Sequence, residues 1–184
     1  RVAASAPPPR RPIRSARCVR LGLLLLVLRV LSVCPLAAEP TQESFDYFFV
    51  IDTSGSMVGK PAGSGNAVIF PQVKEAICSF IRSIESGATL AFLPFHRDVQ
   101  ARKEIVLSDA SRAAACDYVK SLDATGQVTW IYYSLRTALK RAEELRQGAA
   151  GPRIQTLLLY TDGKDNGPQD LTLEGILQHF KLQR

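Results

Sequence analysis

The chain has 184 residues, of which 46% are hydrophobic, and a formal net charge of +6 at pH 7. Seven of its 23 basic residues lie within residues 1–38, which contain no acidic residue, so residues 39–184 hold 16 basic and 17 acidic residues and a net charge of −1. This length accommodates one domain and a leader. The charge of residues 39–184 excludes the general basic excess that is typical of nucleic-acid-binding domains.

Residues 1–38 have the order of a secretory signal peptide. An arginine-rich start precedes an apolar run at residues 21–33, and small residues follow up to Ala38, after which we expect cleavage. The run is short for a membrane span and contains Arg29, so an uncleaved anchor that tethers the protein to a membrane is the weaker alternative. Lipidation of Cys34 is a further alternative, because the residues before it weakly resemble a bacterial lipobox.

The recorded chain starts with an arginine rather than a methionine. We expect translation to begin at Val19, because a start there leaves a leader of ordinary length. The Pro- and Arg-rich residues 1–18 would then be untranslated sequence. Residues 39–44 are expected to form a short polar linker between the leader and the first strand.

The first predicted strand covers residues 45–51, which are aromatic and β-branched and continuously apolar toward their end. This pattern indicates a strand that is buried on both faces, as in a parallel α/β sheet. Asp52, Ser54 and Ser56 follow directly, with a glycine between the serines that allows a sharp turn. Ligands of open α/β sheets bind at the carboxyl ends of the strands, and Mg²⁺ prefers such oxygen ligands. The alternative is an ordinary polar turn.

The next predicted elements are a helix, a strand and an edge strand. Pro71 suits the first turn of a helix, and Gly87 is expected to end it. Apolar residues repeat between them at three- and four-residue steps and give the helix one apolar face. These residues are Val73, Ala76, Ile77, Phe80, Ile81 and Ile84. A strand at residues 88–95 then turns through residues 96–98 into an edge strand at residues 103–107.

Three more helices are predicted in the remainder of the chain. A short helix at residues 113–122 follows Ser108, which is suited to cap it. A longer helix covers residues 130–147, with apolar residues on one face and charged residues on the other. We expect the charged face, which includes Arg141, to be solvated. The last helix is predicted at residues 171–182.

A second carboxylate follows a second buried strand. Residues 154–160 are rich in apolar residues and lead into Asp162. Thr125 and Thr129 add hydroxyl groups in the loop before the long helix. We interpret Asp165 as a turn former, with a contribution to a metal site as the alternative.

Together these segments resemble the von Willebrand factor A (vWA) domain and its metal-ion-dependent adhesion site. That family has an Asp-x-Ser-x-Ser motif, a threonine on a separate loop and an aspartate after the fourth strand. The matching residues are Asp52, Ser54, Ser56, Thr129 and Asp162. Thr129 is preferred to Thr125, because the residues after Thr129 look like the family's threonine loop running into its helix.

The resemblance implies a Rossmann-like α/β fold. The expected architecture is a three-layer sandwich with a mostly parallel central sheet, one antiparallel edge strand and helices on both faces. The resemblance extends over about residues 44–184. In the family two more strands follow, so we expect residues 45–184 to be a vWA domain that is truncated at its carboxyl terminus, with its last two strands beyond residue 184.

The resemblance also implies a metal-ion-dependent protein-binding module for adhesion or assembly. The matching side chains would hold a divalent cation, with Mg²⁺ as the first choice and Mn²⁺ or Ca²⁺ as alternatives. Because few carboxylates bind directly, the cation keeps positive character and an Asp or Glu of a partner protein can complete its coordination. With the leader, this predicts an exported protein that is secreted, periplasmic or associated with the cell envelope.

Two other functions compete with this one. A vWA subunit of an intracellular chelatase or ATPase-linked complex is the first, and the leader argues against it. A metal-dependent hydrolase of the haloacid dehalogenase type is the second, but its Asp-x-Asp-x-Thr motif needs an aspartate where Ser54 stands. No nucleophile elbow or zinc-type spacing accompanies either histidine, so we interpret His96 as a turn residue and expect no enzymatic activity.

Cys78 lies near the apolar face of the first predicted helix, and Cys116 lies in the short helix. Export would permit a disulfide between them. Their sequence positions do not fix the distance that a disulfide requires, and two unpaired, partly buried thiols are the alternative. The sequence leaves both possibilities open.

Overall fold

Strand β1 (Ser44–Asp52) lies at the centre of a four-stranded sheet in the computed structural model. It pairs in parallel with β2 (Thr89–Phe95) on one side and with β4 (Arg153–Tyr160) on the other. β3 (Lys103–Val106) pairs antiparallel with β2, so the strand order is β3-β2-β1-β4. The prediction of a mostly parallel sheet with one antiparallel edge strand is confirmed.

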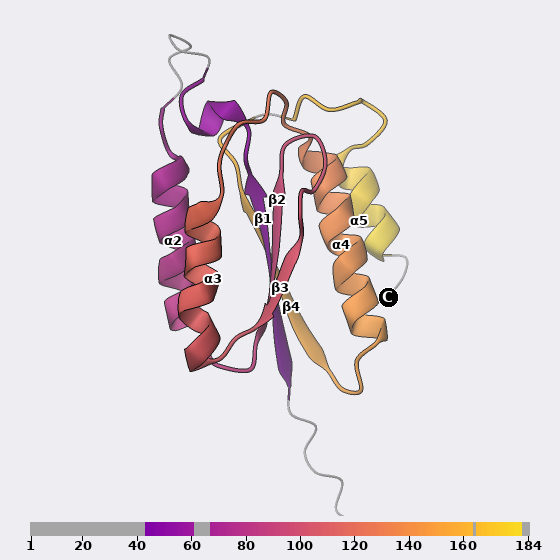
Figure 1. Cartoon of the computed structure of the whole chain (residues 1–184). Helices are drawn as coiled ribbons and strands as arrows, with labels where there is room; N and C mark the ends of the chain where they lie inside the picture. The colour runs from indigo at the N-terminus through magenta and orange to yellow at the C-terminus, as the bar shows by residue number, and fades with distance from the viewer. Residues whose placement is uncertain (1–42, 61–66, 164, 182–184) are drawn as a thin grey trace, which may run out of the picture. The chain divides into compact units, whose positions relative to one another are not determined.

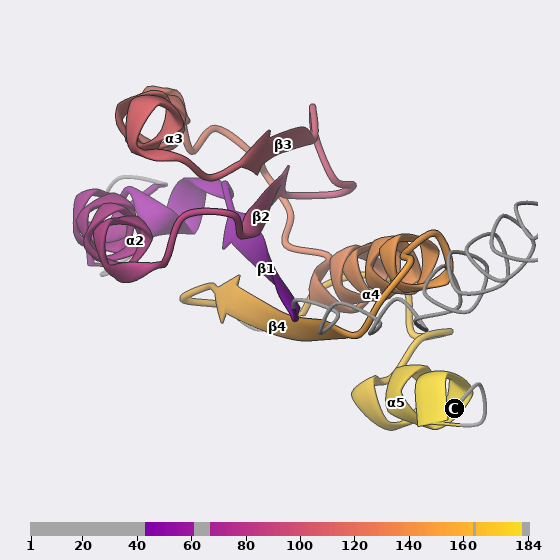
Figure 2. The same ribbon diagram turned by 90° about the horizontal axis from the view of Figure 1, so that it is seen from below.

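Helices cover both faces of this sheet (Figures 1 and 2). α2 (Phe70–Ser83) and α3 (Asp109–Ser121) lie side by side on one face. α4 (Ile131–Gln147) and α5 (Leu173–Lys181) lie on the other face. A short 3₁₀ helix, η1 (Gly55–Met57), follows β1. The fold is therefore the expected three-layer α/β sandwich.

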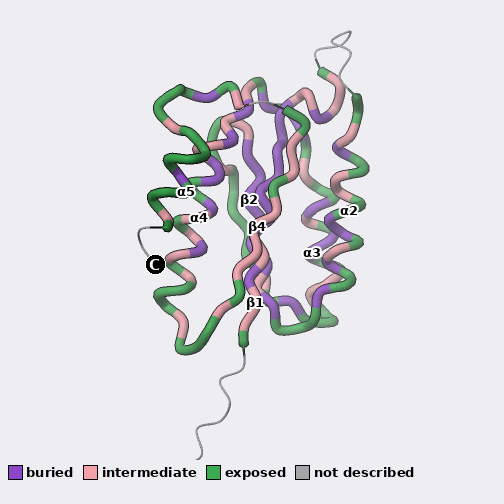
Figure 3. Tube along the Cα trace, turned by 180° about the vertical axis from the view of Figure 1, so that it is seen from behind, coloured by how far each residue is buried: buried purple, intermediate pink, exposed green. Residues whose placement is uncertain are grey.

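The central strand is buried on both faces because its side chains point alternately into two cores. Phe49 and Ile51 pack with residues of α2 and α3, whereas Phe48 and Val50 pack with residues of α4. Each of these side chains is at most 1% exposed. Figure 3 shows the contrast along the chain, with β1 and β2 buried and β4 mainly intermediate. The continuous apolar run in the sequence is thus the mark of a central strand.

The predicted end and buried face of α2 were partly wrong. The helix ends at Ser83, and the positive φ of Gly87, +98°, belongs to the turn before β2. Ala76 is exposed, while Cys78 is fully buried beside Ile77. The apolar stripe is therefore rotated slightly from the predicted one, and it contains a thiol.

Helix α3 begins earlier than predicted, at Asp109 rather than at residue 113. Ser108 and Ser111 form a capping box, in which the Ser111 N–H donates to Ser108 Oγ at 3.2 Å and the Ser108 N–H donates to Ser111 Oγ at 2.8 Å. These bonds stabilise the additional first turn. Ser108 was correctly predicted as the cap.

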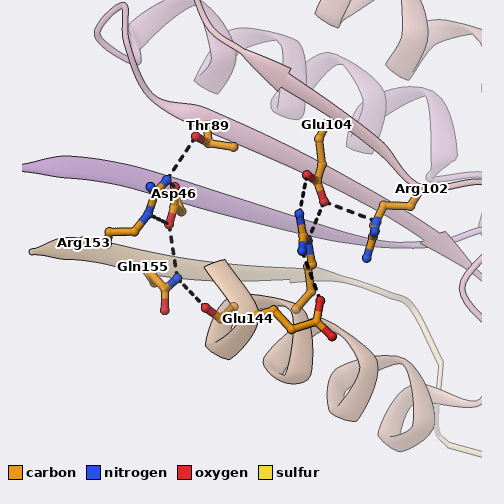
Figure 4. Close-up of polar contacts among 9 residues, drawn as sticks. Asp46, Thr89, Arg102, Glu104, Glu144, Arg153 and Gln155 are labelled. Atoms are coloured by element: carbon orange, nitrogen blue, oxygen red, sulfur yellow. Dashed lines mark hydrogen bonds and ion pairs between the residues drawn. The ribbon is translucent and has the colours of Figure 1, made fainter. Parts of the chain in front are cut away.

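The charged face of α4 is not uniformly solvated. The Arg141 side chain is only 21% exposed, and its guanidinium donates to both carboxylate oxygens of Glu104 in β3, at 2.8 Å each. Figure 4 labels Glu104, the β3 partner in this ion pair. The prediction of a solvated side chain is therefore wrong for Arg141, which ties α4 to β3.

The structure describes residues 43–60, 67–163 and 165–181. The predicted leader, the linker up to residue 42 and the end of the last predicted helix lie outside these ranges. Within these ranges, no helix combines the length and the apolar character that are needed to cross a membrane.

Candidate metal centre

The five side chains predicted as metal ligands lie around the carboxyl ends of β1 and β4 and the loop before α4. Asp52 is the last residue of β1, and Asp162 lies two residues beyond the end of β4. The strands are parallel neighbours, so both segments leave the sheet at the same edge. Ser54 and Ser56 follow β1 in the turn and in η1. Topology thus brings Ser56 and Asp162, which are 106 positions apart, into direct contact.

Hydrogen bonds join four of the five residues in a row. The Ser54 N–H donates to Asp52 Oδ1 at 2.8 Å, and the hydroxyl oxygens of Ser54 and Ser56 are 2.9 Å apart. The Ser56 hydroxyl donates to Asp162 Oδ1 at 3.0 Å. The side-chain oxygens of these residues therefore converge on one small volume.

Asp52 is a buried carboxylate that neutral groups solvate. It is 0% exposed, and its carboxylate accepts hydrogen bonds from the Ser54 N–H and from the Thr161 hydroxyl, which lies 2.7 Å from Oδ2. Burial raises the pKa of Asp52 and the charge of Asp162 adds to the rise, although the hydrogen bonds from Thr161 and Ser54 oppose it. In the described part of the chain no Lys or Arg forms an ion pair with Asp52. A cation at this position would supply the missing countercharge.

Thr129 lies beside the segment that carries Asp162. It is 5% exposed, and its hydroxyl oxygen lies 3.8 Å from the position that a Cβ on Gly163 would take. Its N–H donates to Asn166 Oδ1 at 2.7 Å, and its carbonyl accepts from the Asn166 N–H at 3.0 Å. Thr125, the alternative threonine, is exposed. The geometry favours Thr129 as the third hydroxyl group.

The loop after β4 also holds the first turn of α4. Asp165 Oδ1 accepts a hydrogen bond from the Tyr132 N–H at 3.3 Å, where the N-cap residue Trp130 supplies no side-chain cap. The Tyr133 hydroxyl lies 2.9 and 2.7 Å from the two carboxylate oxygens of Asp170. The segments that carry Asp162 and Thr129 are therefore linked at several points.

Trp130 borders the centre. A Cβ on Gly167 would lie 3.2 Å from its ring, and the Arg97 guanidinium lies over the ring, 5.3 Å from its centroid. The backbone N–H of Trp130 donates to the His96 carbonyl at 2.7 Å. The His96 Nδ1 accepts from the backbone N–H of Arg97 at 2.8 Å. These contacts agree with the interpretation of His96 as a turn residue at the rim.

Three residues that position the candidate ligands were missed in the sequence: Thr161, Asn166 and Gly126. The Gly126 N–H donates to the Thr53 carbonyl at 3.0 Å, and the Gly126 carbonyl accepts from the Gly55 N–H at 2.6 Å. A side chain at Gly126 would collide with the turn after β2. Thr161 was detectable as a hydroxyl at a strand end, whereas no local pattern identifies the partners of Asn166 or Gly126.

The donor set suits a hard cation. In the described ranges no group of three or more His, Cys, Asp or Glu side chains is placed to hold a metal ion. A metal at this centre would therefore depend on hydroxyl oxygens in addition to Asp52 and Asp162. Oxygen-only sets suit Mg²⁺, Mn²⁺ and Ca²⁺, whereas zinc and copper sites commonly use thiolate or imidazole ligands. The residues fit the type of cation that the sequence predicted.

A cavity of about 600 Å³ lies elsewhere, near the start of β1. Tyr47, Phe80 and Ala88 are among its lining residues, and none of the candidate ligands is. The candidate ligand side chains therefore lie at the opposite end of β1 from this cavity.

Comparison with known families agrees with the geometry. The model of the von Willebrand factor type A domain matches residues 46–181, a range that contains all the candidate ligands. Among curated proteins, no sequence matches this chain at a significant level.

Solved structures with a similar fold are distant in sequence. Proximal thread matrix protein 1 (PTMP1) from the mussel byssus, with a zinc-occupied MIDAS motif, is 14% identical, with a TM-score of 0.57 over 77% of this chain and 36% of its own. The von Willebrand factor type A structure from Catenulispora acidiphila is 22% identical and has a TM-score of 0.52, and the match covers 76% of this chain and 30% of that one. The pilus adhesin SpaC from Lactobacillus rhamnosus GG is 19% identical, with a TM-score of 0.51 and coverages of 68% and 16%. The chain spans well under half the length of each protein, and the likeness establishes the fold.

Proposed function

This chain belongs to the von Willebrand factor type A domain family, and we propose that it is a protein-binding module that depends on a divalent cation. The residues that would hold the cation are Asp52, Ser54, Ser56, Thr129 and Asp162. An Asp or Glu of a partner protein would complete the coordination, so that cation and partner bind together. Mg²⁺ is the expected cation, and Mn²⁺ and Ca²⁺ are the alternatives.

The observation that carries this proposal is the spacing of the side-chain oxygens around a buried carboxylate. Neighbouring oxygens along Ser54, Ser56 and Asp162 are 2.9 and 3.0 Å apart. In an octahedral site with Mg–O distances of about 2.0–2.1 Å, adjacent oxygens are also about 2.9 Å apart. The hydroxyl groups can therefore exchange their mutual hydrogen bonds for coordination without moving apart, whereas Ca²⁺ needs longer distances of about 2.3–2.6 Å to its ligands.

The charge of the centre supports a role for a partner carboxylate. In the described ranges, Asp52 and Asp162 are the only acidic residues in the hydrogen-bonded row, and the other members are neutral hydroxyl groups. Two carboxylates balance the charge of a divalent cation without making the centre negative, and where they do not both bind it directly the cation keeps positive character toward a further carboxylate. A centre with three or four carboxylates would repel such a partner.

The proposal extends to the organisation and location of the protein. Residues 1–38 would be a signal-type leader and residues 39–43 a linker, and the binding domain would begin with β1 at Ser44, one residue before the boundary expected from the sequence. The partner would be a protein rather than a nucleic acid, and we expect no catalysis. Export to the cell surface, the periplasm or the medium follows from the leader, and amino-terminal sequencing of the exported protein is expected to find Glu39 as its first residue.

The test combines calorimetric metal titration with peptide binding. Chain stripped with EDTA is titrated with Mg²⁺, Mn²⁺ and Ca²⁺, beside the variants Ser56→Ala and Asp162→Ala. Ser121→Ala is the matched control, because the Ser121 hydroxyl donates to the Tyr118 carbonyl within α3, away from the candidate ligands. Pairs of peptides that differ by Asp or Asn at one position are then screened with and without metal.

We expect metal binding by the wild type and the control, weakened at least tenfold in both site variants, and metal-dependent binding of the Asp peptides alone. Equal metal affinity in the site variants would overturn the assignment of the ligands. Binding of Asp and Asn peptides alike, or in EDTA, would overturn the role of a partner carboxylate.

A further inference from the structure

The two cysteines in the described part of the chain meet in the core between α2 and α3. Cys78 Sγ lies 3.7 Å from the Cys116 carbonyl oxygen, and Cys116 Sγ lies 3.8 Å from the Cys78 carbonyl oxygen. The contact is reciprocal, so each thiol is placed against the backbone of the other residue. Both side chains are buried, Cys78 at 0% and Cys116 at 7% exposed.

This reciprocity restricts the distance between the two residues. A carbonyl oxygen is only two bonds from its own Cα, so two such contacts bring the Cα–Cβ units of both residues close together. A disulfide needs Cα atoms about 4.4–6.8 Å apart and Cβ atoms about 3.5–4.5 Å apart. The two reciprocal contacts are compatible with this spacing, and both cysteines are free thiols in the structure, so bond formation requires each thiol to rotate away from the carbonyl and toward the other sulfur. We propose that Cys78 and Cys116 form a disulfide that links α2 to α3.

The environment of the thiols determines when this bond forms. Burial raises the pKa of the Cys78 thiol to about 11, and the adjacent Cys116 side chain contributes to the rise. The thiolate is the reactive form, so oxidation of the folded protein is slow at neutral pH. The bond forms mainly while the chain folds, when both thiols are accessible.

The oxidant is a low-molecular-weight disulfide such as oxidised glutathione. In the folding chain one of the two thiols, taken here as Cys116, loses its proton to solvent, and its thiolate attacks one sulfur of the oxidant, which releases one thiolate and leaves a mixed disulfide. The Cys78 thiolate, after losing its own proton, attacks the Cys116 sulfur and displaces the second thiolate. Two electrons pass from the protein to the oxidant, which is reduced to two thiols.

Peptide mapping tests this assignment directly and does not depend on metal binding. The full chain is refolded from denaturant in a glutathione redox buffer, alkylated and digested with trypsin without reduction. Cleavage after Lys74, Arg82, Arg112 and Lys120 places Cys78 and Cys116 on two separate short peptides. We expect these peptides as one cross-linked species that reductant separates. The variant Cys18→Ser/Cys34→Ser, which changes only the leader, is expected to give the same species.

The cross-link is also expected to raise the melting temperature. It closes a loop between residues 38 positions apart, and a loop of this size predicts a rise on the order of 10 °C relative to the reduced protein. Cys116→Ala is expected to show no difference between oxidised and reduced samples. Recovery of both peptides in alkylated form, or joined to Cys18 or Cys34, overturns the proposal, and this mapping decides it even if Cys116→Ala fails to fold.

Discussion

Strand β1 buries an aspartate near each of its ends, and the protein treats the two charges differently. Asp46 is 1% exposed and Asp52 is 0% exposed. Both oxygens of Asp46 accept hydrogen bonds from the guanidinium of Arg153, and Gln155 donates a further one (Figure 4). Asp52 instead accepts from neutral groups, the Thr161 hydroxyl and a backbone N–H.

The two environments shift the carboxyl pKa values in opposite directions. Burial acts to raise the pKa of Asp46, but the hydrogen bonds from Arg153 and Gln155 and the charge of Arg153 outweigh it, so this pKa is lowered. At Asp52 burial prevails and the pKa is raised. A buried carboxylate that an arginine neutralises is costly to leave without its partner, whereas one that lacks a countercharge is suited to bind a cation. The difference separates the structural end of the strand, where an ion pair neutralises the aspartate, from the end that carries the proposed cation site, which we call the functional end.

The largest expected effect is at the structural end. Arg153→Met leaves the Asp46 carboxylate buried without its cation, and we expect a loss of about 3–5 kcal/mol in the free energy of unfolding. Urea denaturation in EDTA measures it. The double variant Asp46→Asn/Arg153→Met is the control, because it removes both charges and is expected to recover part of the loss. A double variant as unstable as Arg153→Met would show that the buried charge is not the cause.

At the functional end, Asp52→Asn is expected to keep or raise the free energy of unfolding in EDTA, because an amide is less costly to bury than an unpaired carboxylate. With Mg²⁺ at about a hundred times its dissociation constant, the wild type gains about 2.7 kcal/mol, and the variant is expected to lose this gain. Unfolding curves with and without Mg²⁺ make the comparison. A variant that keeps the metal-dependent gain would remove Asp52 from the site.

The dependence of stability on acid pH tests the role of Asp46 in particular. The folded-state pKa of Asp46 lies below its ordinary value of 3.8, so the unfolded state binds more protons in this range. The stabilisation from Asp46 is complete above that value and is lost as the pH falls through the lower, folded-state pKa. We expect a smaller loss than in Arg153→Met, because protonation neutralises the carboxylate. Asp46→Asn should show a flatter acid limb than the wild type, and parallel limbs would contradict the role of Asp46.

The smallest expected effect comes from a residue that holds a ligand in place. Asn166→Ala removes the acceptor of the Thr129 N–H and is expected to weaken Mg²⁺ binding about tenfold, the lower end for loss of a group that orients a metal ligand. Metal titration by calorimetry checks this. Gln127→Ala changes an exposed side chain in the same loop as Thr129 and should leave the affinity unchanged. An unchanged affinity in Asn166→Ala would mean that the Thr129 loop is held by other contacts.

The sequence predicted interactions between residues that are close along the chain better than interactions between distant residues. Asp52, Ser54 and Ser56 are close along the chain, and their position after a buried strand was enough to place them at a sheet edge. Asp162 could be added because parallel strands end at the same edge. The α/β class and the mostly parallel sheet with one antiparallel edge strand were expected from the family resemblance, and the structure confirms them. The metal-binding role of these residues stays a prediction.

The interactions that the sequence did not predict are pairings between distant, individually ordinary residues. Asp46 is one polar position in an apolar strand, and its partner Arg153 is 107 positions away. Arg141 fits the pattern of a solvated helix face, and only the position of β3 shows that it meets Glu104. Asn166 and Gly126 act through backbone groups of other loops, which leave no periodic signal. Such contacts are fixed by the assembled layers rather than by local preference.

The position of Trp130 gives the protein an intrinsic optical probe. It is the single tryptophan of the chain, and its ring lies close to both Gly167 and the Arg97 guanidinium, next to Thr129. The backbone N–H of Trp130 also connects the Thr129 loop to the turn after β2, through the carbonyl of His96. Fluorescence excited in the tryptophan band therefore comes from one place in the fold, and a change in its emission on adding metal or partner would report on the loops around the centre without an attached dye.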